Sequence, residues 1–453
     1  MKIPVLDLGC LVRKIKNQVK KQIEELKSVT RFKSNPLLNG TLKDGLLRIR
    51  ITNRCNGKCR YCGIKYWSTE EQKRSMPEKW LYNYCVPLYE QIKILLLTGG
   101  DAFVAKESWN YCNFISCNYP QVTLFTESNG IAFDKKWQEL AADNLFRTHF
   151  SLNATTEEIY KKGVWEGEGA VTAFRKIREN MFSYIDLLKS KDLEVFAPSF
   201  SMVINKDTAC DVRNFIKMCL VMGASLSMFY FDYTESNMGE PFFGNPETSR
   251  NALRQLMEIE RVLAKKFFVY FRLWIPLEES RQMQEEVEKI PLKKLEKKYA
   301  DLLDLAKDRS MQEEYEERQR IRKEHGKKEF TFDEDWTPTI HQCKIGDNFV
   351  CSSPWTLLDI YPNGNIECCS WINPRIKILD YIKHDKIEWD SLYNSYKLKS
   401  LRDDMLRNDF NKCMVCCPLN PTCNDVAPPH KYGFDRVENN DDRYPSIKKS
   451  SHP

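Results

Sequence analysis

Three cysteines lie close together in the spacing Cys55-x3-Cys59-x2-Cys62, directly after an apolar run. Three thiolates in one loop can each bind one iron of a cubane cluster and leave the fourth iron without a protein ligand. A tetrahedral zinc ion also accepts thiolates, but a structural zinc site needs a fourth ligand nearby. No His or Cys lies between Cys62 and Cys85. The spacing therefore favours an iron–sulfur cluster with one open position.

A second group of thiols lies toward the end of the chain, after residue 340. Two thiols on a β-hairpin and two in a short loop can together form a four-thiolate site. We expect an auxiliary [4Fe–4S] cluster there, on Cys351, Cys369, Cys413 and Cys416. Cys368 is an alternative to Cys369, and a zinc ribbon is the alternative to the cluster. Three further thiols leave an additional, incomplete cluster open: Cys343, Cys417 and Cys423.

Strand-like and helix-like segments alternate between residues 46 and 235. The strand-like runs cover 46–55, 92–103, 122–130, 147–154, 195–205 and 225–233. Apolar strands that alternate with amphipathic helices predict an α/β fold with a parallel sheet. Six repeats fit a partial (β/α)6 barrel, in which the chemistry lies at the carboxyl ends of the strands. The polar candidates lie at those ends: Asn53–Cys62, Thr98–Asp101, Glu127–Gly130, Ser151–Asn153, Asn205 and Asp232–Glu235.

Four segments resemble the radical SAM superfamily. CNGKCRYC, with an aromatic residue before its third cysteine, resembles the family's signature, and LLLTGGDAF resembles its Gly-Gly-Glu motif with Asp101 in place of Glu. ESNG at 127–130 resembles the family's Thr-Asn-Gly segment. HFSLNA at 149–154 resembles the segment near the ribose and carboxylate of the cofactor. The resemblance covers roughly residues 45–235.

The resemblance implies two cofactors, a [4Fe–4S] cluster on Cys55, Cys59 and Cys62 and S-adenosylmethionine. In the family the reduced cluster cleaves S-adenosylmethionine to a 5′-deoxyadenosyl radical, which abstracts a hydrogen atom from the substrate. The electron would come from an external one-electron reductant of the flavodoxin or ferredoxin type. Glycines let a backbone approach a ligand closely, and a carboxylate suits the cationic amine. We expect S-adenosylmethionine to contact Tyr61, Gly99, Gly100, Asp101, Asn129, Ser151, Asn153 and Ser201.

The C-terminal segment resembles the auxiliary-cluster extension of radical SAM enzymes, which occurs in a two-cluster SPASM form and a one-cluster twitch form. CSSPWTLLDIYPNGNIECC at 351–369 contains a Pro-Asn-Gly hairpin turn, and a helix-like segment at 389–410 precedes the CxxC pair. Because Cys423 is the last cysteine, one auxiliary cluster is favoured. The predicted parts are an N-terminal helical extension, the barrel, a charged helical insertion, a small cluster-binding domain and a flexible tail, at 1–45, 46–275, 276–336, 337–425 and 426–453.

An auxiliary cluster near the substrate implies oxidation or crosslinking, because a substrate radical can release its electron to that cluster. A ribosomally made peptide is the first substrate expectation, although some 45 residues before the first strand are too few for a leader-recognition module. A small polar metabolite, such as a sugar, an aminocyclitol or an amino acid derivative, is the alternative. The rival from another class is a non-catalytic iron–sulfur electron carrier or scaffold.

Composition limits the remaining possibilities. The 453 residues include 69 Lys+Arg and 63 Asp+Glu, a net charge of +6, which gives nucleic acid binding little support. No apolar run is long enough to span a membrane, and no export signal precedes the chain's first strand, so a cytoplasmic protein with reduced thiols is expected. Residues 11–27 predict an amphipathic helix. The charged stretch 281–330 predicts exposed helices with a thin apolar stripe, either a solvated decoration or a docking arm.

Overall fold

The computed structural model describes ten stretches of the chain. They are residues 45–224, 226–231, 246–263, 266–272, 277–306, 310–330, 342–345, 348–351, 357–368 and 376–406. The expected N-terminal helix and C-terminal tail lie outside these residues. So do three of the four expected auxiliary ligands: Cys369, Cys413 and Cys416.

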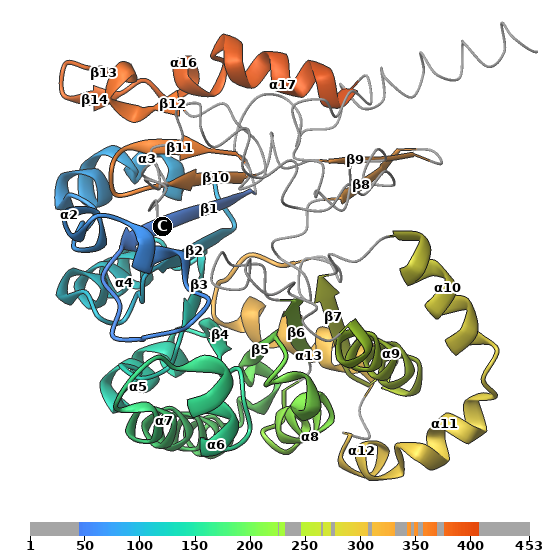
Figure 1. Cartoon of the computed structure of the whole chain (residues 1–453). Helices are drawn as coiled ribbons and strands as arrows, with labels where there is room; N and C mark the ends of the chain where they lie inside the picture. Colours follow the sequence, from blue (N-terminus) through green and yellow to red (C-terminus); the bar gives the residue numbers. More distant parts are fainter. Residues whose placement is uncertain are drawn as a thin grey trace, which may run out of the picture.

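The described residues form an α/β fold around one mostly parallel sheet (Figure 1). Its strand order is β12-β11-β10-β1-β2-β3-β4-β5-β6-β7, and β1 to β7 are parallel neighbours in chain order. These seven strands are β1 (Leu46–Thr52), β2 (Ile94–Gly99), β3 (Thr123–Ser128), β4 (Arg147–Ser151), β5 (Ser199–Ile204), β6 (Leu226–Phe231) and β7 (Phe268–Arg272). Each of the six predicted strand runs contains one of them, so the parallel sheet is confirmed.

Helices cover the outer side of the curved sheet (Figure 1). Between the strands lie α2 (Thr69–Gln72), α3 (Val86–Tyr89), α4 (Lys106–Asn118), α5 (Lys135–Asp143), α6 (Glu157–Ile159), α7 (Ala170–Ser190), α8 (Val212–Val221) and α9 (Pro246–Leu263). Alternate strand residues such as Leu47 and Ile49 pack against them in the main core. Among the described helices, none is both long and apolar enough to cross a bilayer.

The opposite, inner face of the sheet is closed at its lower end by a small apolar cluster. Phe330 packs there against Leu46, Leu96 and Phe125, together with Ile94 and Leu357. The adjacent Lys328 holds this position, because its Nζ donates to the carbonyl of Ile92 at 3.0 Å. Residues in the first halves of β1, β2, β3 and β10 therefore form an apolar floor with Phe330, and the carboxyl ends of the strands lie opposite it.

The charged segment before Phe330 forms four helices, α10 (Leu277–Glu288), α11 (Leu292–Lys298), α12 (Ala300–Leu305) and α13 (Met311–Glu324). The predicted apolar stripe is buried at Leu295, Tyr299 and Leu302. The interpretation as a solvated decoration or docking arm is wrong for its end, because Arg318 is buried and donates from Nε to the Val195 carbonyl at 2.6 Å. The end of this segment, α13, is thus packed against the barrel.

The predicted C-terminal hairpin forms β10 (Leu357–Ile360) and β11 (Asn365–Glu367), with a turn at 361–364. Unexpectedly, β10 is parallel to β1, so the hairpin extends the barrel sheet. Asp359 on β10 is fully buried and lies 3.4 Å from Arg48 Nη1 and 3.1 Å from Arg50 Nη2. A buried carboxylate with two guanidinium partners explains the attachment of this edge.

The remaining described elements belong to the C-terminal part. They are β8 (Gln342–Ile345), β9 (Asn348–Cys351), β12 (Ile376–Lys377), β13 (Ile382–Lys383), β14 (Lys386–Ile387), α16 (Trp389–Tyr393) and α17 (Tyr396–Leu406). The helix predicted over 389–410 is therefore two helices, divided at Asn394 and Ser395. Figure 1 shows α16 and α17 at the side of the sheet where β11 and the edge strand β12 lie.

Candidate active site at the carboxyl ends of the strands

The cysteine loop begins three residues after β1 ends. Gly57 lies between the first two thiols: a Cβ on this residue would be 3.3 Å from Cys55 Sγ and 3.8 Å from Cys59 Sγ. The Gly57 N–H also donates to Cys55 Sγ at 3.2 Å. Cys62 is tied back to the same loop, because its N–H donates to the Cys59 carbonyl at 3.2 Å. The expected triad is thus gathered in one compact loop.

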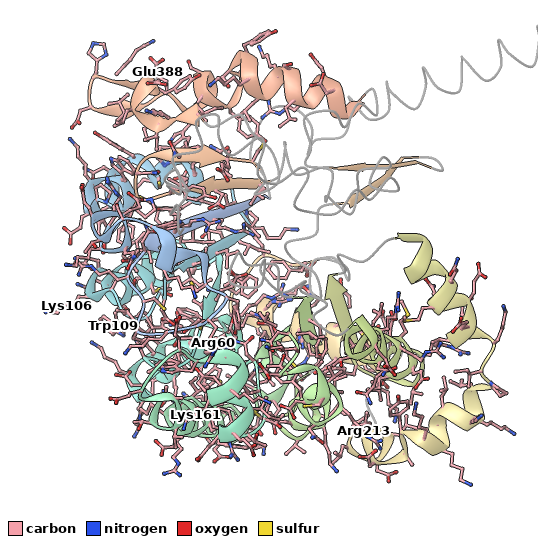
Figure 2. All side chains as sticks on the ribbon, in the orientation of Figure 1. Arg60, Lys106, Trp109, Lys161, Arg213 and Glu388 are labelled. Atoms are coloured by element: carbon pink, nitrogen blue, oxygen red, sulfur yellow. The ribbon has the colours of Figure 1, made fainter. Side chains whose placement is uncertain are left out.

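The loop is anchored to the chain segment that follows the fourth strand. The Arg60 N–H donates to the Val164 carbonyl at 2.9 Å, and Arg60 Nε donates to the Trp165 carbonyl at 2.9 Å. Figure 2 labels Arg60 at this position. Lys65 adds an ion pair with Glu166 at 3.2 Å. The sequence offers no local signal for these contacts, since they join residues about a hundred positions apart.

Electrostatics at the loop disfavour bare thiolates. Removal from water, and then the charge of Asp101, raises the pKa of Cys55 to about 12. Removal from water, and then the neighbouring Cys62, raises the pKa of Cys59 to about 12. Three thiolates here require a bound cation. Within the described residues no three His, Cys, Asp or Glu side chains converge on a single ion. A cubane would instead take one iron per thiolate, so the donor set fits a cluster.

Asn129 connects the third strand to the loop. Its Nδ2 lies 3.5 Å from Cys55 Sγ and donates to Asn56 Oδ1 at 2.8 Å. Its own N–H donates to Asp101 Oδ2 at 2.9 Å, and Ser128 Oγ donates to the same oxygen at 2.8 Å. The structure therefore brings two predicted cofactor-binding residues, Asp101 and Asn129, to the first thiol.

Asp101 is fully buried, and its other oxygen accepts the Phe103 N–H at 3.0 Å. Burial raises the pKa of this carboxyl above its usual value. We expected the carboxylate to face the methionine amine. Its three donors all come from its own chain, so in this structure it positions Ser128 and Asn129.

Gly99 and Gly100 permit a close approach between two backbone segments. A Cβ on Gly99 would lie 2.1 Å from the Thr52 carbonyl oxygen, and one on Gly100 would lie 2.2 Å from that of Arg54. The Gly100 N–H donates to the Thr52 carbonyl at 2.7 Å. From the sequence we expected these glycines to let the backbone approach S-adenosylmethionine closely. The structure shows that the path of the chain into the cysteine loop already requires them.

The remaining predicted residues lie at neighbouring strand ends. Ser201 Oγ donates to Ser151 Oγ at 3.3 Å. Asn153 has a left-handed backbone (φ 66°), which Asn tolerates better than most residues. Its Nδ2 donates to the Ser151 carbonyl and its Oδ1 accepts the Val203 N–H, so it joins the ends of β4 and β5. Tyr61 is half-buried against the core beside the cysteines.

The expected auxiliary ligands are only partly described. Cys351 ends β9, and Cys343 lies on its hairpin partner β8. Cys368 is buried at the end of the hairpin strand β11. The auxiliary cluster thus stays a prediction.

A comparison with known protein families matches the region that contains the cysteine loop. The sequence profile of the family described as Radical SAM superfamily matches residues 49–219. This region is therefore a radical SAM domain, of a superfamily whose members are enzymes that use a [4Fe–4S] cluster and S-adenosylmethionine.

Similar proteins include enzymes named GTP 3′,8-cyclase. That of Campylobacter lari is 29% identical over 117 residues, which cover 25% of this chain and 36% of the relative. A probable GTP 3′,8-cyclase of Methanocaldococcus jannaschii is 22% identical over 222 residues, 49% of this chain and 69% of the relative. The chain spans about a third of the length of the first of these relatives.

Two solved structures match this chain at low sequence identity and with TM-scores below 0.5. Streptococcus suis SuiB bound to S-adenosylmethionine has a TM-score of 0.48 and 12% identity, and covers 89% of this chain and 76% of its own. The structure of anSMEcpe with bound AdoMet has a TM-score of 0.47 and 13% identity, covering 87% and 94%.

Proposed function

We propose that this protein cleaves S-adenosylmethionine reductively and uses the resulting radical to abstract a hydrogen atom from a substrate. The observation that carries the proposal is the compact loop of Cys55, Cys59 and Cys62 at the carboxyl end of β1, in contact with Asn129. These three residues would hold a [4Fe–4S] cluster. When bound, the cluster and S-adenosylmethionine would supply the 5′-deoxyadenosyl radical.

The chain's own residues then have positioning tasks. Asn129 orients Cys55 through its side-chain amide, and Asp101 fixes Asn129. Gly99 and Gly100 hold β2 against the start of the loop. Tyr61, Ser151, Asn153 and Ser201 lie around the strand ends, and we propose that they line the S-adenosylmethionine site together with the backbone at Gly99 and Gly100.

We further propose that the protein is an oxidoreductase. An auxiliary [4Fe–4S] cluster on Cys351, Cys369, Cys413 and Cys416 would receive the electron of the substrate radical. A flavodoxin- or ferredoxin-type protein would reduce the first cluster. The substrate would be a ribosomally made peptide or, as the alternative, a small polar metabolite.

The test is anaerobic reconstitution with iron and sulfide, followed by dithionite and S-adenosylmethionine. Wild-type protein should bind about eight irons and form 5′-deoxyadenosine. Replacing Cys55, Cys59 and Cys62 together with Ala should remove about four irons and all 5′-deoxyadenosine. Cys117→Ala, on the exposed side of α4, is the matched control and should change neither.

Two results would overturn parts of the proposal. Cleavage that persists in the triple variant would exclude the cysteine loop as the site. Wild-type protein with full iron content that never forms 5′-deoxyadenosine would favour a non-catalytic iron–sulfur protein. A parallel reaction with GTP tests the activity named for the relatives, and a cyclised guanosine product would replace the oxidation proposal.

A further inference from the structure

A row of polar side chains crosses the inner face of the sheet below the cysteine loop. Arg50 is paired in register with Thr98, and Glu127 with His149, which is paired in turn with Ser199. Thr98 Oγ1 donates to Glu127 Oε2 at 3.0 Å and links the two halves of the row. Five neighbouring strands thus place polar groups at one level.

This level lies between the cysteine loop and the apolar floor. Glu127 precedes Asn129 by two residues, and strands rise about 3.3 Å per residue, so Glu127 lies roughly 7 Å below Asn129, the residue that contacts Cys55. Phe125 lies two residues further down, where it packs with Phe330. A substrate that enters from the side of the cysteine loop would therefore meet this row before the apolar cluster around Phe330.

The row is not packed like the outer face. Thr98, Glu127 and Ser199 remain partly exposed, whereas Thr126, on the other face of β3, is buried. His149 is only 4% exposed and lies between Glu127 and Ser199 in the row. Buried polar side chains that serve only the fold are normally enclosed by their partners. Partial exposure of Thr98, Glu127 and Ser199 on an inner face indicates that these three side chains meet a ligand, with His149 directly beside them.

His149 has the chemistry of a proton acceptor. Its Nδ1 is hydrogen-bonded to Ser199 Oγ at 2.8 Å, which leaves Nε2 for another partner. Burial lowers the pKa of His149 to about 4; Glu127 on β3 opposes this shift and Arg147 on β4 adds to it. The imidazole is therefore neutral near pH 7, and a neutral imidazole has one nitrogen that accepts a proton.

We propose that Glu127 and His149 bind a hydroxyl- or amine-bearing carbon of the substrate, and that His149 accepts the proton which that group loses. Both side chains offer acceptors, and acceptors select a donor such as O–H or N–H over a carboxylate. This inference rests on the proposed function and adds a substrate class to it.

The step balances for an alcohol. The C–H hydrogen would leave as an atom to the radical that the bound S-adenosylmethionine would supply, and His149 Nε2 would take the O–H proton. The remaining electron would go to a one-electron acceptor, the role proposed for the auxiliary iron–sulfur cluster, and a C=O double bond would form. An amine would give an imine by the same sequence.

Diethylpyrocarbonate, which acylates neutral and reachable imidazoles, tests the inference without an identified substrate. The reconstituted full chain is treated between about pH 5 and 8, and mass spectrometry reports each histidine. His149 should be modified at a rate that stays constant over this range, because it remains neutral. If the exposed His384 were modified and His149 were not, His149 would be an unreachable core residue and the inference would be overturned. So would a rate for His149 that falls about tenfold from pH 7 to pH 5.

The ligand class is tested by protection. At equal millimolar concentrations, myo-inositol should slow acylation of His149 and succinate should not. Glu127→Ala should abolish the protection while His149 stays reactive, and Glu139→Ala on the surface of α5 is the matched control. Protection by succinate, or by neither probe, would reject a donor-bearing ligand. Failure of the proposed function would look different, as protein that never cleaves S-adenosylmethionine whatever the reactivity of His149.

Discussion

The side-chain amide of Asn129 lies 3.5 Å from the sulfur of Cys55, while the backbone of the same residue is held by Asp101 at 2.9 Å. A carboxylate at the end of β2 thus fixes the first thiol of the loop through a residue after β3. Asp101 stands where the family's motif has Glu. Its shorter side chain is buried and accepts hydrogen bonds from Phe103, Ser128 and Asn129.

Asp101→Ala should therefore weaken both the fold and the cluster site. The change leaves the donors of Phe103, Ser128 and Asn129 without their buried acceptor, and each lost partner costs about 1–3 kcal/mol. We expect a lower urea midpoint and less iron per chain after reconstitution. Asp143→Ala, which removes only a surface ion pair with Lys191, is the control. Unchanged iron content with unchanged stability would contradict this role.

Gly99→Ala and Gly167→Ala form a matched pair. Both glycines have positive φ, 132° and 81°, so both substitutions carry backbone strain of about 1–3 kcal/mol. Only at Gly99 would the new methyl meet backbone, 2.1 Å from the Thr52 carbonyl, whereas nothing lies within 4 Å at Gly167. Thermal unfolding should show a large drop for Gly99→Ala and a small one for Gly167→Ala. Equal drops would mean that strain alone matters.

The sequence predicted the strands because their residues form local apolar runs, as in Ile94–Gly99, and it predicted the hairpin from its turn at 361–364. It could not predict that β10 pairs with β1, since the two are some 310 residues apart and Asp359 looks like an ordinary hairpin residue. Phe330 was missed for a related reason: a single aromatic residue ends a charged stretch, and only tertiary packing makes it a floor.

The same limit applies to the site. Spacing was sufficient to identify the three loop cysteines as a group, because ligands of one cluster can be close in sequence. The inward orientation of Asp101 depends on Ser128 and Asn129 of another strand. Glu127 is the first residue of ESNG, but its partners Thr98 and His149 lie on neighbouring strands, and only the register of the sheet brings them together.

Asp359→Asn should destabilise the β10 edge. The substitution leaves Arg48 and Arg50, which are largely buried, without their shared carboxylate, and breaking such a pair costs roughly 3 kcal/mol. Chemical unfolding should show the loss, and hydrogen exchange should rise first in β10 and β11. Asp385→Asn, at an exposed ion pair with Lys79, should change stability little. Faster exchange spread evenly over the sheet would argue against a local edge role.

His149 should make stability depend on pH in a defined window. Its folded pKa of about 4 lies below the ordinary value of 6.5, so the unfolded chain binds the proton first as the pH falls. Stability should therefore decrease from pH 6.5 toward pH 4, by about 2 kcal/mol at pH 5 from this group alone. Urea unfolding at pH 7 and 5 should show a smaller difference in His149→Gln than in wild type. Equal differences would show that other groups govern the acid response.

Adjacent cysteines at the end of the hairpin allow the auxiliary ligand to be identified. Cys368 is 4% exposed and packs in the main core, whereas Cys369 lies outside the described residues and is the proposed ligand. Cys368→Ala removes one buried sulfur and should cost about 1 kcal/mol in unfolding free energy, with iron content unchanged. Cys369→Ala should lose about four irons while cleavage of S-adenosylmethionine survives, because the loop cysteines are intact.

The two variants differ by one position in the chain, so a general effect of thiol loss would appear in both. Iron analysis and electron paramagnetic resonance of the reduced proteins separate the outcomes. Loss of the second cluster from Cys368→Ala alone would transfer the ligand role to Cys368 and require its sulfur to leave the core packing seen here. Retention of about eight irons in both variants would exclude this hairpin end as a source of a cluster ligand.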